Sequence, residues 1–182
     1  MRRHLAYAAA GAVVLALTSC GDDPEPQVAD PTSTPSSSSS PSESAAAEKE
    51  PWEEKTDDGA VAFVEHWLDV FNEMQTSANT QEFSSIGTDG CRACAEFVSI
   101  NQEIAADGGT IESKGWKLID AAVGAASTNA KKEVVAHLDQ SPERISYSGA
   151  KKPREYPGGE ATVLMTLVWQ ESTWVMDEVA FP

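Results

Sequence analysis

Two cysteines three positions apart, Cys91 and Cys94, have the spacing in this chain that most directly suggests chemistry. Such a pair can form a disulfide that fixes a helix start, exchange that disulfide with other thiols, or supply two of the roughly four ligands of a zinc ion. A helix N-terminus and Arg92 would stabilise a thiolate, which favours exchange. Redox pairs of this kind usually follow a strand, however, whereas a helical stretch and a Gly-containing turn precede this one. Zinc binding is the least favoured of the three, because the chain lacks a second cysteine pair to complete the ligand set. We therefore favour a structural disulfide and keep exchange as the alternative.

Histidine and tryptophan are weaker candidates. After residue 50 the chain contains only His66 and His137, and a metal site would need both of them together with a carboxylate. We expect two solvated histidines, no metal and no cofactor. The chain also contains five tryptophans, which core packing explains best, while an aromatic lining for a small apolar ligand is the functional alternative. They are Trp52, Trp67, Trp116, Trp169 and Trp174.

One basic cluster, Lys151, Lys152 and Arg154, stands out against an acidic chain. The sequence has 13 Lys and Arg against 29 Asp and Glu, a formal charge of −16. This charge repels nucleic acid and an anionic lipid face, so we expect neither as a partner. The cluster is a solvated loop or, alternatively, a docking patch for an acidic envelope partner. The sequence has no serine-hydrolase elbow, phosphate loop, dinucleotide fingerprint or HExxH motif, and we assign no catalytic residue.

The elements that must position these residues begin with helices. After Asp57 or Asp58, either of which can cap a helix, apolar residues recur at three- and four-residue steps and predict one apolar stripe. A short second helix is expected near Thr80, and a third from Cys91 to the stop at Gly108. The stripe of the first helix consists of Ala60, Phe63, Val64, Trp67, Leu68 and Phe71.

The second half of the chain changes to an alternating pattern, which predicts strands. A turn at residues 170–173 joins the last two of them as a hairpin. Helices followed by antiparallel strands describe an α+β domain, in which N-terminal helices pack against a curved antiparallel sheet. The expected strands cover residues 116–121, 134–139, 145–147, 163–169 and 174–181.

The start of the chain has the form of an export signal. A short basic stretch precedes an apolar run that ends at Leu17 and is too short to span a bilayer. The segment Leu17-Thr18-Ser19-Cys20 resembles the bacterial lipobox, whose cysteine is acylated and becomes the first residue of the mature protein. By this resemblance residues 1–19 are a lipoprotein signal peptide. The acyl chains, palmitate among them, would anchor Cys20 in the cell membrane with the rest of the chain on the extracytoplasmic face.

The stretch from residue 20 to 50 separates this anchor from the domain. It is rich in Ser, Pro and acid and has no hydrophobic period, so we expect a disordered linker. Residues 51–182 hold most of the large apolar side chains and are expected to form one α+β domain.

The order of helices and strands is similar to the nuclear-transport-factor-two-like fold, in which helices pack into a cone-shaped sheet. The lipobox, the linker and the run Gly90-Cys91-Arg92-Ala93-Cys94 resemble an actinobacterial group of exported lipoproteins, the domain-of-unknown-function family numbered 6318. The resemblance covers roughly residues 50 to 182. It implies a fold and a location, and no activity.

The cone fold also implies a cavity. Enzymes of that fold carry an acid or base and a hydrogen-bond donor inside the cone. The candidate cavity residues of this chain, all on or beside predicted strands, are Trp116, Asp120, His137, Tyr147 and Trp169.

These features favour a non-enzymatic, membrane-anchored exported lipoprotein that binds a small apolar ligand or an envelope protein. Relatives of the fold often dimerise through the sheet, so a homodimer is part of the expectation. One alternative is a thiol–disulfide exchange protein that uses Cys91 and Cys94. The other is a small cone-fold enzyme, for which the deciding feature would be a cavity containing a carboxylate with a raised pKa.

Overall fold

A computed structural model describes residues 49–148 and 152–182, and Cys20, the predicted signal and linker up to residue 48, and Lys151 lie outside the described residues. The helical half consists of the short 3-10 helix η1 (Pro51–Glu53), α1 (Asp57–Ser77), α2 (Gln81–Ser85) and α3 (Arg92–Ala106). The strands are β1 (Thr110–Ser113), β2 (Trp116–Val123), β3 (Lys131–Gln140), β4 (Glu143–Ser146), β5 (Arg154–Tyr156), β6 (Gly159–Gln170) and β7 (Thr173–Ala180).

Helix α1 forms as its apolar period predicts. Thr56 caps its N-terminus, because the Thr56 hydroxyl accepts a hydrogen bond from the backbone N–H of Gly59 at 2.9 Å. The sequence had suggested Asp57 or Asp58 for this role. Asp57 and Asp58 lie in the first turn, where the helix dipole favours acids. The helix ends at Ala78, which has a left-handed φ of 58°.

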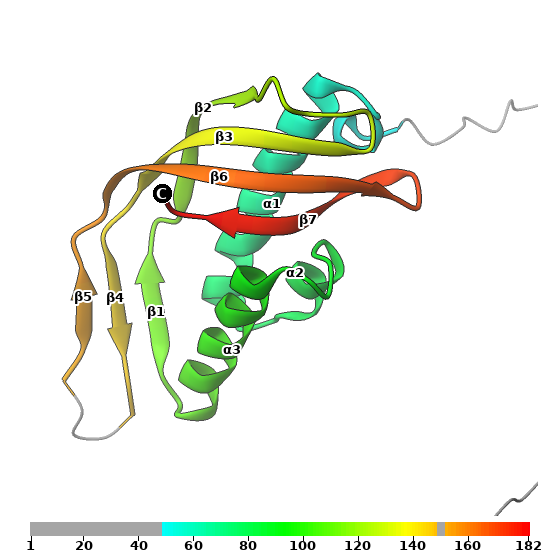
Figure 1. Ribbon diagram of the computed structural model, residues 1–182. Coiled ribbons are helices and arrows are strands. Elements are labelled where there is room, and N and C mark those ends of the chain that lie inside the picture. Colours follow the sequence, from blue (N-terminus) through cyan, green and yellow to red (C-terminus); the bar gives the residue numbers. More distant parts are fainter. Residues whose placement is uncertain (1–48, 149–151) are drawn as a thin grey trace, which may run out of the picture. The chain divides into compact units, whose positions relative to one another are not determined.

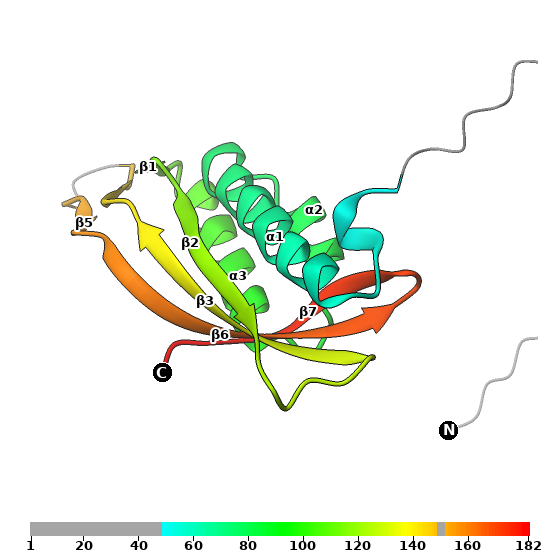
Figure 2. The ribbon, with the colours of Figure 1, turned by 90° about the horizontal axis from the view of Figure 1, so that it is seen from above.

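The strands form two antiparallel sheets. The larger has the order β2-β3-β6-β7 and the smaller the order β1-β4-β5. The helices cover one face of the larger sheet, and the small sheet runs at a steep angle to it beside α3 (Figures 1 and 2). The protein is therefore an α+β domain with its helices packed against antiparallel sheets, as the sequence predicted.

The division into two sheets, and strands β1 and β5, were not predicted. The two sheets are divided at three short breaks in the chain, which separate β1 from β2, β3 from β4, and β5 from β6. Pro142 has no N–H to give to a ladder. Gly158 has a φ of 72°, and a Cβ there would lie 2.3 Å from the carbonyl oxygen of Gln140. The sheet therefore bends sharply along this line.

The core lies between the helices and the large sheet. On β3, the inward residues Val134, Ala136 and Leu138 are fully buried, which confirms the predicted alternation. The stripe of α1 packs against them, and Phe83 and Cys94 close the core from α2 and α3. Burial of these apolar side chains is the main contribution to the stability of the domain.

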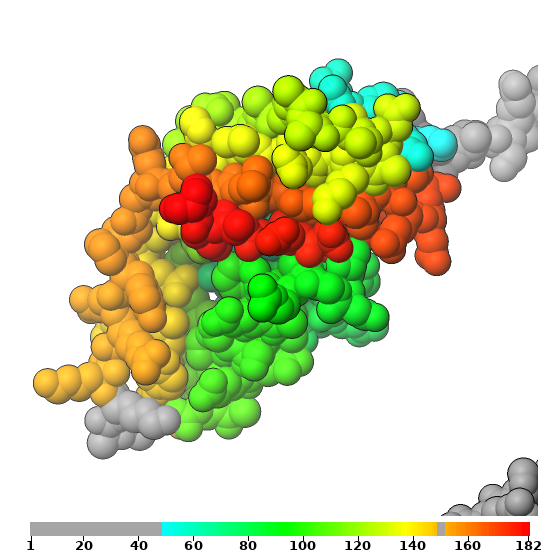
Figure 3. Space-filling view, viewed as in Figure 1, coloured from blue at the N-terminus to red at the C-terminus, as the bar shows by residue number. Residues whose placement is uncertain are grey.

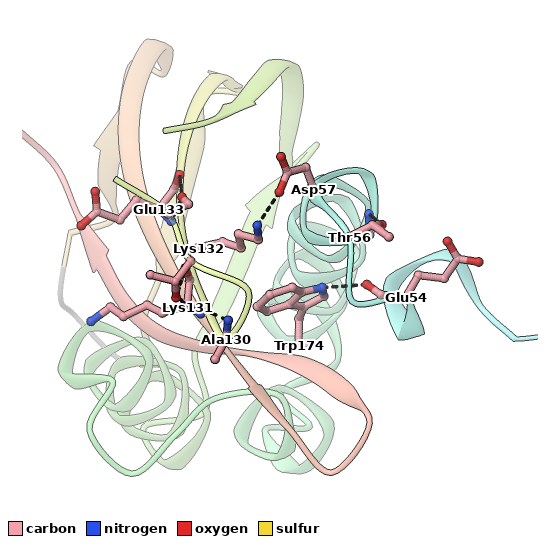
Figure 4. A network of polar contacts seen from close by, with 11 residues as sticks. Glu54, Thr56, Asp57, Ala130, Lys131, Lys132, Glu133 and Trp174 are labelled. Carbon is pink, nitrogen blue, oxygen red and sulfur yellow. Dashed lines mark hydrogen bonds and ion pairs between the residues drawn. The ribbon is translucent and has the colours of Figure 1, made fainter. Parts of the chain in front are cut away.

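A polar clasp fixes the start of the domain, where η1 leads into α1 (Figure 4). The fully buried indole of Trp174 donates a hydrogen bond through Nε1 to the carbonyl oxygen of Glu54 at 2.9 Å. Beside it, the buried Lys132 forms an ion pair with Asp57 in the first turn of α1. These two contacts attach the segment before α1 to strand β7 and the first turn of α1 to strand β3.

Candidate ligand-binding pocket

A cavity of about 400 Å³ lies between α1, α3 and the small sheet, and we call it the α1–β4 pocket. The space-filling view shows a hollow between the yellow and orange strands β4 and β5 and the green helix α3 (Figure 3). Three residues at the sheet bend described above also line the pocket, namely Gln140, Ser141 and Gly158. Its apolar walls are Phe71, Phe97, Ile100, Ile111, Trp116 and Ile145.

Two polar side chains from different elements meet in this pocket. Gln75 on α1 donates a hydrogen bond through Nε2 to Oε2 of Glu143 on β4 at 2.9 Å. Burial disfavours the charged carboxylate and raises the pKa of Glu143 above its ordinary value, while the hydrogen bond from Gln75 acts in the opposite direction. The amide oxygen of Gln75 is buried and has no hydrogen-bond partner among the described residues.

Trp116 is held at the pocket by the side chain of Asn72. The backbone N–H of Trp116 donates to Asn72 Oδ1 at 2.8 Å, and Asn72 Nδ2 donates to the carbonyl oxygen of Trp116 at 2.9 Å. Asn72 thus pairs with the first residue of β2 as a neighbouring strand would. The approach requires glycine at position 115, because a Cβ there would lie 2.6 Å from the Asn72 side chain.

Two of the predicted cavity residues, Asp120 and His137, lie on the outer face of the large sheet. They are cross-strand partners whose Oδ1 and Nδ1 atoms are 3.6 Å apart, and their side chains are 65% and 50% exposed. For Asp120 the expected alternation fails because a bulge between Leu118 and Asp120 inserts Ile119 and shifts every later residue of β2 to the opposite face. His137 faces outward because it alternates with the buried Ala136 and Leu138 on β3. Their placement in the cavity is therefore corrected, and of the five candidates only Trp116 lines the pocket.

The other two candidates also lie elsewhere. Trp169 stands at the β6–β7 hairpin, where its ring packs edge-on against Trp174 with ring centres 5.1 Å apart. Its predicted role in the cavity is therefore corrected. Tyr147 follows β4, and the Arg154 guanidinium lies 5.9 Å from its ring centre. Arg154 is not in a loop, since it is the first residue of β5, and Lys152 precedes it on the surface.

Cys91 and Cys94 are bonded to each other at the start of α3. The Cys91 sulfur also accepts the backbone N–H of Cys94, as an N-cap does. The two residues are 1% and 6% exposed, although a hollow of about 300 Å³ borders them. An attacking thiolate needs access to a sulfur, so this burial favours the structural role over exchange.

The sequence contains a signal for the pocket residues that were missed. Gln75 lies four positions after Phe71, which itself lies four after Trp67, so a polar residue occupies the apolar stripe of α1. Glu143 shares the strand face of Ile145, two positions away. A polar residue on each of two inward-facing surfaces is the pattern that could have identified this pair.

A model of a family of unknown function, DUF6318, matches residues 31–180 of the chain. The protein belongs to this family. The match begins within the predicted linker and ends in the last strand, so every part of the α1–β4 pocket is DUF6318 sequence. No curated protein matches this DUF6318 chain in sequence.

Solved structures show what this DUF6318 domain is similar to in fold. The intermembrane-space region of the chloroplast protein ARC6 matches with a TM-score of 0.54 at 14% identity, covering 69% of this chain and 95% of that one. A protein with a cystatin-like fold from Caulobacter vibrioides matches at 11% identity, covering 64% and 83%, with a TM-score of 0.42. An NTF2-like protein from Novosphingobium aromaticivorans matches at 10%, covering 64% and 76%, with a TM-score of 0.38. At these identities the likeness concerns the fold alone.

Across residues 49–148 and 152–182, no three His, Cys, Asp or Glu side chains come together as metal ligands would. His66 packs in a stack on Trp52, with ring centres 4.1 Å apart, and burial lowers its pKa. Within the same two ranges, no helix is both long enough and apolar enough to cross a bilayer.

Proposed function

We propose that this DUF6318 protein is an exported, lipid-anchored binding module whose α1–β4 pocket takes a small and mostly apolar ligand. The observation that carries the proposal is the pocket itself, in which aromatic and aliphatic walls surround one polar pair, the buried Gln75 and the half-buried Glu143. Ligand sites are typically of this kind, with volumes of roughly 300–1,000 Å³ and few polar groups that fix orientation. The pocket's volume of about 400 Å³ is sufficient for a molecule of two fused rings.

A fluorescence experiment tests the binding. N-phenyl-naphthylamine is an uncharged dye that emits strongly when it leaves water for an apolar site. We expect the full-length protein to increase its emission in a saturable way. Replacing Ile111 on the edge strand β1 by Trp fills the pocket and should abolish the signal.

The matched control is the same substitution outside the pocket. Ile119 lies in the bulge of β2 and is 51% exposed, so Ile119→Trp adds an identical ring where it blocks nothing. The two variants should melt within a few degrees of the parent. Equal dye binding by the Ile111→Trp and Ile119→Trp variants would remove the pocket from the proposal.

The anchoring rests on the resemblance of Leu17-Thr18-Ser19-Cys20 to the lipobox. Metabolic labelling with palmitate, followed by fractionation of a bacterial host, tests it. We expect the parent to carry label and sediment with membranes, and Cys20→Ser to lose both properties. Cys94→Ser, the same cysteine-to-serine change within the domain, should keep the label. A Cys20→Ser variant that is processed and retained like the parent would exclude a lipid anchor.

One observation favours a second candidate, a small acid–base enzyme. Glu143 is a carboxylate of raised pKa in a largely apolar pocket, and such groups can remove a proton from carbon. In heavy water, a base at this position would exchange the acidic C–H protons of beta-tetralone for deuterium through its enolate. Mass spectrometry should then detect exchange with the parent and none above background with Glu143→Gln. No exchange with either leaves ligand binding as the function.

A further inference from the structure

The α1–β4 pocket contains charge of one sign. Its lining residues all lie in the described ranges, and none of them is a Lys, Arg or His. Glu143 is the carboxylate among them, and Gln75 donates a hydrogen bond to one of its oxygens, Oε2. A bound group that carried negative charge would meet this carboxylate with no cation to neutralise either of them.

A neighbouring hollow, whose other charged residues lie on the opposite face of the small sheet, adds to this negative environment. It shares the wall of Glu143 and Tyr156 with the pocket and is also lined by Glu112, Arg144 and Glu155. The Arg144 guanidinium lies between the two glutamates, 4.0 Å from Glu112 and 3.9 Å from Glu155. One cation therefore faces three acids around this wall, so negative charge exceeds positive charge near the pocket and favours a cationic ligand.

The aromatic side chains of the pocket suit a cation as well. Trp116 lies with its ring centre 4.7 Å from that of Phe71 and 6.1 Å from that of Phe97, so three rings form one wall. Tyr156 stands at the opposite side and is 47% exposed. The faces of such rings attract ammonium groups, most strongly where water is excluded.

We propose that the ligand of the α1–β4 pocket is an organic cation, an apolar body that carries one ammonium group paired with Glu143. The inference rests on the proposed binding function and specifies its ligand class. The apolar body fills the space between the rings and the isoleucines. The ammonium group donates hydrogen bonds to the carboxylate of Glu143, so each charge compensates for the desolvation of the other.

Three ligands with the same ring isomer and different head groups test the charge. Naphthylmethylammonium, naphthylmethanol and naphthoate are cationic, neutral and anionic at neutral pH. Calorimetric titration of the full-length protein should rank them in this order. We expect the ammonium compound to bind at least about tenfold more tightly than the alcohol, and naphthoate to show no binding in the same concentration range.

Two single-charge variants separate the carboxylate in the pocket from the charge of the protein as a whole. Glu143→Gln keeps an acceptor for Gln75 and should bring the ammonium and alcohol affinities within about threefold of each other, leaving the alcohol unchanged. Glu155→Gln removes one charge on the outer side of the same sheet, outside the pocket, and should preserve the tenfold ratio. Dye binding that equals that of the parent in each variant shows that the pocket is intact.

The outcomes distinguish the two proposals. Equal affinities of the ammonium compound and the alcohol in the parent overturn the cation inference but leave the binding function standing. Naphthoate binding more tightly than the other two ligands would have the same consequence. So would a Glu155→Gln variant in which the ammonium-to-alcohol affinity ratio falls as far as it does in Glu143→Gln. If none of the three ligands and no dye binds, the binding function and the ligand class fail together.

Discussion

Replacing Asn72 by Ala should both destabilise the domain and weaken the pocket. The change removes two hydrogen bonds, those to the N–H and the carbonyl oxygen of Trp116, at 2.8 and 2.9 Å. At about 1 kcal/mol for each bond, the loss is about 2 kcal/mol. For a domain of about 130 residues the unfolding entropy near the midpoint is roughly 0.28 kcal/mol per degree, so the midpoint should fall by about 7 °C.

Thermal unfolding of the full-length chain, followed by far-UV circular dichroism, measures this shift. Asn79→Ala is the control, because Asn79 accepts one exposed hydrogen bond from Gln81 and should move the midpoint by less than about 2 °C. Asn72→Asp is nearly isosteric, yet it turns the donor toward Trp116 into an acceptor, so it should destabilise as well. An Asn72→Ala protein that melts within about 2 °C of the parent, with unchanged dye affinity, would refute the strand-like role of this side chain.

Three further predictions concern stability. Ala78 has a φ of 58° at the end of α1, so Ala78→Gly should raise the free energy of unfolding by about 1 kcal/mol in urea titration. Asp57→Asn removes the partner of buried Lys132 and should cost about 1 kcal/mol more than Asp58→Asn, which shares only the helix dipole; equal costs would show that the ion pair contributes nothing. Burial raises the pKa of Glu143, so its contribution to stability is full below the pKa of the unfolded chain and is lost as pH rises through the higher pKa of the folded protein. The free energy of unfolding of Glu143→Gln should therefore fall less than that of the parent as pH rises from about 4 to about 7. An equal fall in the two proteins would contradict burial as the cause of the raised pKa of Glu143.

The elements that the sequence predicted well are those whose pattern is uninterrupted. The stripe of α1 recurs through Trp67 and Phe71 without a break, and the alternation on β3 buries Val134, Ala136 and Leu138 together. In both cases burial decides the local structure, and the spacing of apolar residues records that burial directly.

The features that escaped prediction arise from contacts between distant segments. Nothing near Ile119 in the sequence shows that β2 contains a bulge, because a bulge is defined by the register with β3. The break at Pro142 could be suspected, but its alignment with Gly158 depends on strand pairing. The meeting of Gln75 and Glu143, which are 68 positions apart, follows from that same bend.

The clasp at Glu54 and Asp57 lies close in sequence to residue 49, where the described part of the chain begins. Along α1 the clasp and Gln75 are separated by about 27 Å, and Figure 1 places η1 and the strands β4 and β5 at opposite ends. A pulling force applied to the domain at residue 49 would therefore act first on the contacts of the Trp174 indole and the Lys132 ammonium, about 27 Å along α1 from Gln75 in the α1–β4 pocket.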